Sequence, residues 1–259
     1  MKLNFYKYQG TGNDFVLIDN RLMDFPKDNT DLIAQLCDRR FGIGSDGFIL
    51  LEPSDISDFK MVYYNSDGNE SSMCGNGGRC IVAFAKKMKI IGNKTTFDAV
   101  DGLHEATIHK GIVSLGMTDI ETLNTYQNHT FIDTGSPHHV EFRKNVDDID
   151  VKVEGAHIRK GAPYFEAGSN VNFATQKDGN SFKVRTYERG VEDETLACGT
   201  GVTAVALAAH CNKLTESNKI NLEVLGGNLE VSFKVSKGIY TEVYLTGPAE
   251  FVFKGTIEI

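Results

Sequence analysis

Two short stretches of the chain carry the same pattern: residues 74–78 read Cys-Gly-Asn-Gly-Gly, and residues 198–202 read Cys-Gly-Thr-Gly-Val. Each is followed by a run without proline in which apolar residues recur at the three-to-four spacing of a helix face. Each cysteine is therefore predicted to lie at a helix N-terminus. At such a position the helix dipole and the small neighbouring residues favour binding of a carboxylate and lower the pKa of a thiol.

The surroundings of the two cysteines also correspond. The cysteines are separated by about half of the 259-residue chain, and polar residues precede both at a similar distance: Tyr64-Asn65 before the first, Tyr187-Glu188-Arg189 before the second. Each half reads as strands, a polar turn, a cysteine, a helix and further strands. We interpret the chain as a duplicated unit with one reactive cysteine in each half, and its length favours two domains over one.

Composition limits the classes of partner and compartment. The net charge is −8 and no dense run of Lys and Arg is present, which argues against nucleic acid and anionic membranes and favours a small-molecule ligand. Neither a signal-peptide-like N-terminus nor a membrane-spanning segment is visible, so the cytoplasm is expected. Five cysteines, an odd number, indicate reduced thiols, and none is grouped with His at ligand spacing, so no metal site is predicted.

Residue patterns predict a strand-rich α/β chain with mainly antiparallel or mixed sheets, because no helical crossover separates most of the strands. A first helix begins near Thr30, carries Cys37 in its apolar stripe and ends at Arg39-Arg40. Residues 135–139 are interpreted as a rigid turn that presents two imidazoles, and residues 118–128 as a polar linker. Further helices are predicted over 150–158 and 199–211, and strands over 2–9, 15–19, 48–51, 59–65, 95–99, 104–109, 112–117, 130–133, 139–142, 170–175, 182–188, 220–225, 229–235, 240–245 and 250–259.

Two thiols at helix N-termini are compatible with three kinds of chemistry. A single nucleophilic cysteine would serve a thiol hydrolase, with a histidine as its partner. A redox pair would require both sulfur atoms within disulfide reach. Alternatively, two thiols on opposite faces of one carbon could remove a proton from one face and return a proton to the other, which inverts the stereocentre.

The third alternative requires one thiolate and one thiol at the same time. General acid–base assistance contributes about 10²–10⁴-fold, so further stabilisation must come from helix dipoles and N–H groups directed at the substrate's α-carboxylate, where negative charge develops.

The chain resembles the diaminopimelate epimerases in the order and spacing of its motifs, over essentially its whole length. The residues that carry this resemblance are Asn13, Asn65, 74–77 (Cys-Gly-Asn-Gly), 136–138 (Ser-Pro-His), Asn170, 188–190 (Glu-Arg-Gly) and 197–201 (Ala-Cys-Gly-Thr-Gly).

The resemblance implies an isomerase, independent of pyridoxal phosphate and of any other cofactor, that interconverts LL- and meso-2,6-diaminopimelate in lysine and peptidoglycan precursor synthesis. It implies that Cys74 and Cys198 are the acid–base pair. The implied carboxylate-binding residues are Gly75, Asn76, Gly199 and Thr200. The residues implied to hold the amines and the distal end are Asn13, Asn65, Asn170, Glu188 and Arg189, and His138 and Glu188 are implied to orient the reacting amino group.

The resemblance also implies a fold of two pseudo-symmetric α/β domains, each a curved sheet around a central helix, with the active site in the cleft between them. The expected domains are 1–118 plus 249–259, carrying Cys74, and 119–248, carrying Cys198. A homodimer is compatible with this family. One departure is Ser136, which stands where many relatives have Asn, so a substrate contact made there would be shorter or bridged by water.

Other interpretations remain open at this point. Another cofactor-free racemase with a cysteine pair, such as the proline racemase group, is the nearest alternative, and Arg189 with the several Asn residues favours diaminopimelate over it. A thiol-based redox or hydrolytic enzyme, and a catalytically silent binding protein, are the others.

Overall fold

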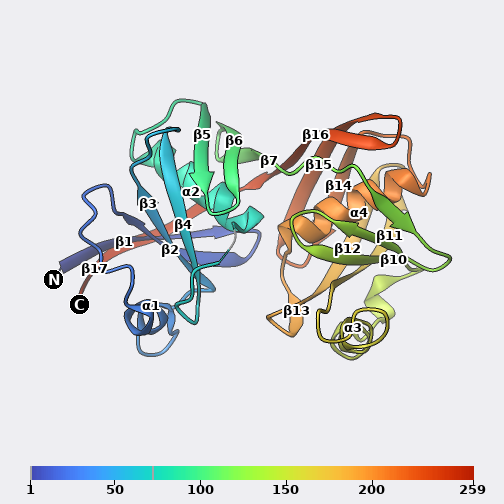
Figure 1. Ribbon diagram of the computed structural model, residues 1–259, viewed down its shortest axis with the longest axis horizontal. Coiled ribbons are helices and arrows are strands. Elements are labelled where there is room, and N and C mark those ends of the chain that lie inside the picture. Colours follow the sequence, from blue (N-terminus) through green and yellow to red (C-terminus); the bar gives the residue numbers. More distant parts are fainter. Residues whose placement is uncertain (1, 72) are drawn as a thin grey trace. The chain divides into compact units, whose positions relative to one another are not determined.

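The computed structural model describes residues 2–71 and 73–259, and the chain divides into two compact units. The first comprises Met1–Leu115 with Gly247–Ile259, and the second comprises Gly116–Thr246. Both units combine helices with sheets that contain antiparallel and parallel strand pairs, as the sequence predicted (Figure 1).

In the first unit, β1 and β2 form an antiparallel hairpin, β2 lies parallel to β3, and β3 lies antiparallel to β4. Strand β4 then lies parallel to β5, which continues antiparallel into β6 and β7. The last strand, β17, returns to pair antiparallel with β1. The elements are β1 (Lys2–Gly10), β2 (Asn13–Asp19), α1 (Thr30–Cys37), β3 (Gly47–Glu52), β4 (Phe59–Asn65), α2 (Gly75–Lys87), β5 (Lys94–Ala99), β6 (Gly102–His109), β7 (Ile112–Gly116) and β17 (Glu250–Glu258).

The second unit repeats this order of pairings. Strand β9 is antiparallel to β10, β10 is parallel to β11, β11 is antiparallel to β12, β12 is parallel to β14, and β15 and β16 continue antiparallel. The elements are β8 (Leu123–Thr125), β9 (Thr130–Asp133), β10 (Pro137–Phe142), η1 (Val146–Asp148), α3 (Val151–Lys160), β11 (Asn170–Asp178), β12 (Ser181–Glu188), β13 (Asp193–Thr195), α4 (Gly199–Cys211), β14 (Lys219–Val224), β15 (Gly227–Ser236) and β16 (Ile239–Pro248). The predicted duplication is therefore confirmed at the level of topology.

Each unit has one central helix. Helix α2 packs on β1, β2, β3, β4, β6 and β17, and α4 packs on β9, β10, β11, β12, β14 and β15 (Figure 1). Residues 75–85 of α2 are all buried, and so are residues 201–209 of α4. A helix that is apolar on all sides belongs in a core, and α4 fits this rule. The outer helices α1 and α3 pack on β3 and on β11–β13, respectively.

Three local predictions are wrong. Helix α1 ends at Cys37, two residues before the predicted end, because Asp38 leaves the helical conformation and its carboxylate accepts from the N–H groups of Arg40 and Phe41. Residues 137–139 belong to β10 and not to a turn. Proline is tolerated as the first residue of a strand, so Pro137 does not prevent pairing there. Both imidazoles are consequently buried, His138 completely and His139 to 5% exposure.

The third correction concerns residues 118–128, predicted as a linker. Ile120 is buried and forms a bridge with Tyr240, and β8 pairs with β9 within the second unit. Polarity suggested an unpaired connection, but exposed residues at the edge of a sheet have the same composition.

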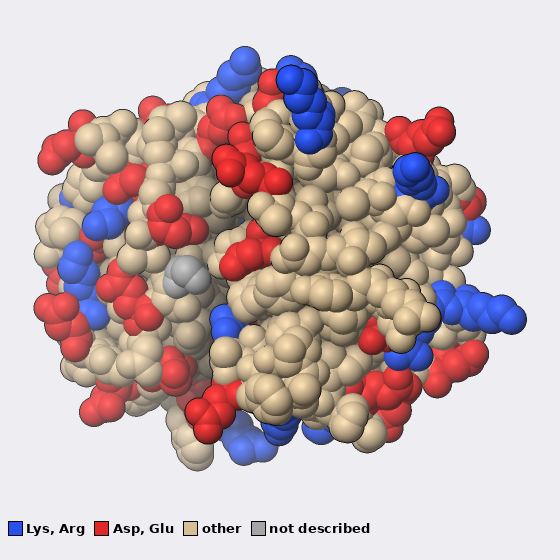
Figure 2. Space-filling view, turned by 45° about the vertical axis from the view of Figure 1, so that its right-hand side comes forward, with Lys and Arg blue, Asp and Glu red and all other residues tan. Residues whose placement is uncertain are grey.

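Two further features concern the surface and the helices. On the face shown in Figure 2, Lys and Arg side chains are interspersed with Asp and Glu side chains. Within the described parts of the chain, no helix has the length and apolar character needed to cross a membrane.

Candidate active site

The first cysteine lies where the sequence predicts, at the N-terminal cap of α2. Cys74 has extended backbone dihedrals, φ −96° and ψ 131°, and its carbonyl accepts the first helical hydrogen bond from the N–H of Gly78 at 2.7 Å. The thiol is half-buried at the positive end of the helix dipole.

The β1–β2 hairpin brings Asn13 to this cysteine. The Cys74 Sγ lies 3.7 Å from Asn13 Oδ1, and Asn76 Nδ2 donates to the same oxygen at 3.2 Å. Asn13 Nδ2 donates to Asp46 Oδ2 at 2.8 Å, which fixes the orientation of the Asn13 amide. Three predicted site residues, Asn13, Cys74 and Asn76, thus lie together, although the hairpin alone would pass for an ordinary turn.

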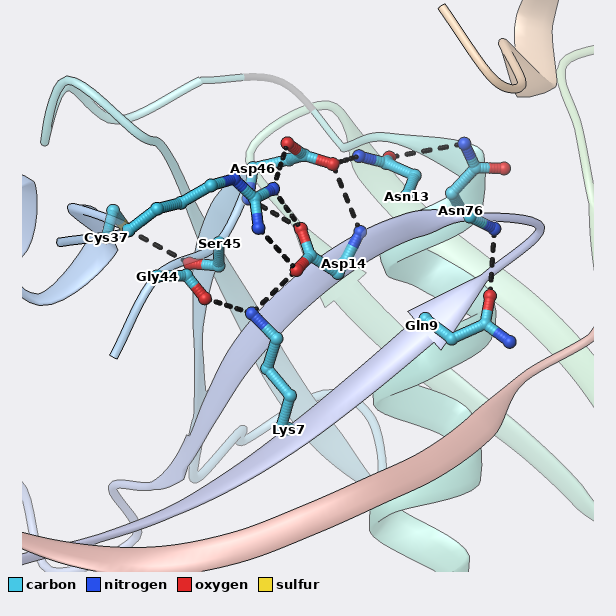
Figure 3. A network of polar contacts seen from close by, with 11 residues as sticks. Lys7, Gln9, Asn13, Asp14, Cys37, Gly44, Ser45, Asp46 and Asn76 are labelled. Carbon is cyan, nitrogen blue, oxygen red and sulfur yellow. Dashed lines mark hydrogen bonds and ion pairs between the residues drawn. The ribbon is translucent and has the colours of Figure 1, made fainter. Parts of the chain in front are cut away.

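A polar network extends from Asn13 into the unit (Figure 3). Asp46 accepts from Arg39 at 2.8 Å, Arg39 also donates to both carboxylate oxygens of Asp14, and Lys7 lies 2.8 Å from Asp14. Burial opposes ionisation of Asp14, but the hydrogen bonds from Arg39 and Lys7 and the Lys7 charge outweigh it, so the pKa of that carboxyl lies well below its usual range. The network therefore holds the hairpin with charge-assisted hydrogen bonds.

Asn65 occupies a different environment. It is exposed at the end of β4, and its backbone closes a turn by donating to Asn69 and accepting from Gly68. Its side chain has no hydrogen bond to Asn13, Cys74 or Asn76 among the contacts of the described residues.

The second cysteine caps α4 in the same way. Cys198 is extended, with φ −118° and ψ 112°, and its carbonyl accepts from Val202 N–H at 3.0 Å. Its Sγ lies 3.5 Å from the Thr200 hydroxyl, and Thr134 donates to the Thr200 carbonyl at 2.9 Å. The first turn containing Gly199 is thereby attached to the loop before β10, and only 7% of Cys198 is exposed.

Glycine is required at one position of this turn. A Cβ atom on Gly201 would lie 2.4 Å from Asn172 Oδ1, well inside van der Waals contact. Asn172 is fully buried, and its oxygen also accepts from the Thr186 hydroxyl at 2.9 Å. The small residue after Thr200 therefore allows the helix start to approach a buried amide.

The same amide sets the tautomer of His138. Asn172 Nδ2 donates to the His139 carbonyl at 3.2 Å and lies 3.0 Å from His138 Nδ1, so Nδ1 accepts and the proton of the neutral ring resides on Nε2. Burial, with a contribution from the Arg189 charge, lowers the pKa of His138 to about 3. His138 is therefore a neutral imidazole at physiological pH, and its buried Nε2–H finds no acceptor in the described parts of the protein.

Asn170 lies opposite His138 in the parallel pair of β10 and β11. Its Nδ2 donates to Ser136 Oγ at 2.9 Å and to the Pro137 carbonyl at 3.0 Å, and its Oδ1 accepts from the Arg189 N–H at 2.9 Å. Both amide protons are thus used within the protein, and one lone pair on Oδ1 remains. Ser136, which stands where many relatives have Asn, is thus one of the groups that orient Asn170.

Arg189 and Glu188 lie at the end of β12. Arg189 is exposed and donates from Nη1 to the Ala167 carbonyl at 2.9 Å, which orients the guanidinium and leaves its other N–H groups for a carboxylate. Glu188 is half-buried, and its carbonyl accepts from Glu192 at 2.8 Å.

Sequence reasoning missed the residues that position these groups. Asn172 lies two residues after Asn170 on the same face of β11, which period-two alternation would have indicated. Thr134 carried no signal of its own. Arg79 is a charged residue within the buried run of α2, and this break in an apolar stripe was a usable signal. No group of three or more His, Cys, Asp or Glu side chains in the described residues is arranged to hold a metal ion.

Comparisons with known proteins identify the family of the chain. The family model described as diaminopimelate epimerase matches residues 5–119 and 130–252. A curated diaminopimelate epimerase from Flavobacterium psychrophilum is 62% identical over 258 residues, which cover 99% of this chain and 100% of that protein.

Two solved structures show a similar fold. A Bacillus anthracis phenazine biosynthesis protein of the PhzF family has a TM-score of 0.79 at 12% identity, with 100% of both chains covered. A hydroxyproline epimerase from Agrobacterium vitis, with bound trans-4-hydroxy-L-proline, has a TM-score of 0.69 at 12% identity, covering 99% of this chain and 92% of that chain. These low identities concern the fold alone, whereas the sequence match covers almost the whole chain at high identity: the chain belongs to the diaminopimelate epimerase family.

Proposed function

We propose that the protein is a cofactor-independent isomerase that interconverts LL- and meso-2,6-diaminopimelate in the synthesis of lysine and peptidoglycan precursors. Family membership supports the substrate. The single observation that carries the mechanism is the repeated cap: a cysteine precedes the central helix in each of two units with the same strand topology. A duplicated fold thus supplies two equivalent thiols, which a two-base inversion requires.

In the proposed reaction, one thiolate removes the α-proton and the other thiol protonates the opposite face of the same carbon. Cys74 and Cys198 exchange these roles for the reverse direction. Negative charge develops on the α-carboxylate, and the starts of α2 and α4 at Gly75, Asn76, Gly199 and Thr200 are the groups that stabilise it through their dipoles and N–H donors.

The remaining predicted residues are proposed to hold the substrate. The oriented guanidinium of Arg189 suits the distal carboxylate, and the remaining lone pair on Asn170 Oδ1 suits an ammonium group. His138 carries a proton on Nε2, so it can donate to a carboxylate oxygen or to the lone pair of a neutral amine. Asn13, Asn65 and Glu188 are the other proposed amine and distal-end ligands.

Isotope exchange tests the reaction directly. Incubation with LL-diaminopimelate in deuterated water should place deuterium at one α-carbon and produce the meso isomer, measured by mass spectrometry and chiral chromatography. Absence of exchange there, together with exchange on proline or hydroxyproline, would replace this proposal by the proline racemase alternative.

Cysteine variants test the mechanism. Cys74→Ser and Cys198→Ser should each lower kcat by at least ~10²-fold, the lower range of general acid–base assistance, because a serine hydroxyl is a far weaker acid than a thiol. Cys211→Ser is the matched control, since Cys211 is an exposed free thiol at the end of α4. Full activity in either single variant would exclude two-base catalysis. A redox enzyme would instead be activated by mild oxidation, which should inactivate an epimerase.

Three further assignments are part of the proposal. The functional domains are 1–118 plus 249–259 and 119–248. None of the five cysteines of the described chain forms a disulfide, which supports a reducing compartment, the cytoplasm. A homodimer is proposed because three successive residues of β17, Phe251, Val252 and Phe253, are 41%, 53% and 44% exposed. Sedimentation should give a dimer mass that falls toward that of the monomer in Val252→Asp; a monomer at all concentrations excludes this assignment.

A further inference from the structure

Arg79 is a fully buried cation that has no acidic partner among the described residues. It lies in the second turn of α2, five residues after Cys74, and its exposed fraction is 0%. In the described parts of the protein, no carboxylate lies within ion-pair distance of its guanidinium. A buried charge is ordinarily paired, because desolvation of an unpaired ion is costly. Apart from Asn76, the other residues of this buried run are glycine or apolar, so the presence of a charge here calls for a functional explanation.

Among the described residues, every oxygen that accepts a hydrogen bond from Arg79 is neutral. Its Nη2 donates to Thr11 Oγ1 and to Asn76 Oδ1, both at 3.0 Å, and its Nη1 donates to the Gly75 carbonyl at 3.2 Å. Nε lies 3.4 Å from the Pro248 carbonyl. The guanidinium therefore connects the first turn of α2 to the turn of the β1–β2 hairpin.

These bonds determine where the Asn13 oxygen points. Because Asn76 Oδ1 faces Arg79, its Nδ2 must face Asn13, to which it donates at 3.2 Å. Asp46 holds the other end of the Asn13 amide at 2.8 Å. Asn76 and Asp46 thus hold the Asn13 amide so that its oxygen faces the Cys74 thiol. A hydrogen-bond acceptor in this position favours the protonated form of the thiol.

We propose that Arg79 is the positioning residue of the first cysteine: it fixes Asn76 and the hairpin turn so that Asn13 faces Cys74, and its unpaired charge favours the Cys74 thiolate. Asn13 and Arg79 then act in opposite directions on the same thiol. A group that must serve as base in one direction and acid in the other needs both forms accessible, and this opposition supplies them. The inference rests on the proposed role of Cys74.

The other charged groups near this site are largely compensated. Lys7 and Arg39 neutralise Asp14 and Asp46. Asp101, from the β5–β6 turn, pairs with His104 and accepts from the backbone of Met73. Cys80, beside Arg79, is fully buried, and burial raises the pKa of its thiol, so it stays neutral. Among the described residues, Arg79 is therefore the principal unpaired charge at the start of α2.

The test follows the pH dependence of alkylation of Cys74 by iodoacetamide, resolved by peptide mass spectrometry, which needs no epimerase activity. Arg79→Met should move the midpoint for Cys74 upward by about one pH unit, a tenfold lower thiolate fraction at neutral pH, while Cys211 keeps its profile. Lys86→Met, which removes an exposed cation from the same helix, should not move it. Equal midpoints in Arg79→Met and Lys86→Met would overturn the electrostatic part of the proposal.

Two conservative variants distinguish the effect of the Arg79 charge from the effect of its hydrogen bonds. They also keep the proposal testable if Arg79→Met does not fold. Arg79→Gln removes the charge but keeps an amide donor, and it should shift the alkylation midpoint as Arg79→Met does. Arg79→Lys keeps the charge but cannot reach Thr11 and Asn76 together, so its midpoint should stay near that of the parent while kcat for epimerisation falls about tenfold. An Arg79→Lys variant with the kcat of the parent would overturn the positioning part. If the unsubstituted protein did not epimerise diaminopimelate, the proposed function would be refuted, but the effect of Arg79 on the alkylation of Cys74 would remain valid.

Discussion

Lys7 and Asp14 form a largely buried ion pair in the first unit. Their side chains are 7% and 18% exposed, and Lys7 also donates to the Gly44 carbonyl. The pKa of Asp14 is lower in the folded than in the unfolded protein, where it is about 4. The ionised carboxylate therefore stabilises the fold at pH values above the unfolded-state pKa. This stabilisation is lost as the pH falls through the lower pKa of the folded state.

Lys7→Met should raise the folded pKa of Asp14 and narrow this difference. We expect stability at neutral pH to fall by about 2 kcal/mol, less than the range for breaking a buried pair because Arg39 still binds Asp14. Acid unfolding, followed by circular dichroism, should begin at higher pH. Lys2→Met is the control on the same strand, where the pair with Glu258 is exposed and contributes little. An unchanged acid midpoint in Lys7→Met would contradict the assignment.

At the residue scale, the sequence identified both cysteines and most polar groups near them. It did not identify Arg79, Asn172 or Thr134, because their effect comes from which amide or carbonyl they face. Asn170 illustrates this limit: the residue was identified, but its two amide protons are bound to Ser136 and Pro137, which spacing along the chain does not reveal.

At the scale of elements, close packing decides whether a glycine can be replaced. Gly155 in α3 is buried, and a Cβ atom there would lie 2.4 Å from Tyr187 Cβ and 2.7 Å from its Cγ. Tyr187 Cβ is fixed to the backbone of β12 and cannot rotate away. Helix α3 can therefore approach the sheet this closely only with glycine at position 155.

Gly155→Ala sets two effects against each other. Alanine in a helix is favoured over glycine by about 1 kcal/mol, whereas overpacking a core position costs ~1–3 kcal/mol. Since the overlap is with an immobile atom, we expect a net loss of about 1–2 kcal/mol in the free energy of unfolding by urea. Gly179→Ala, where a Cβ meets nothing within 4 Å, should leave it almost unchanged. A stabilised Gly155→Ala would show that helix propensity dominates.

Helices and strands could be predicted from local patterns because apolar residues recur at different spacings in the two kinds of element. The wrong predictions also arose from local patterns. Proline and glycine near residues 135–139 indicated a turn, but β9 and β11 on either side of β10 provide the pairing that makes residues 137–139 a strand. Long-range pairing of this kind overrides local propensity.

At the scale of the whole molecule, the chain returns to its beginning. Strand β17 pairs with β1 from Lys2↔Glu258 to Gln9↔Glu250, and Ile257 and Ile259 pack against the core of the first unit. The first unit therefore requires residues from both ends of the chain.

Removal of residues 250–259 should destabilise the first unit selectively. Amides of β1 lose the strand that pairs with them, so their hydrogen exchange should accelerate by at least about tenfold, while amides of residues 116–246 keep their protection and serve as the internal control. Mass spectrometry of exchanged peptides gives both values in one experiment. Equal loss of protection in the two units would show that they unfold as one.

The sequence by itself determined the repeated cysteine caps, the duplicated order of elements and the family, because these depend on residue types at fixed spacing. Only the tertiary structure decided that the buried Arg79, with no acidic partner among the described residues, bonds to the first turn of the Cys74 helix. The same holds for the buried neutral His138 and for Asn170, whose amide is bonded to Ser136, Pro137 and Arg189. The physical reason is that protonation and hydrogen-bond orientation depend on neighbours far apart in the chain, which only folding brings together.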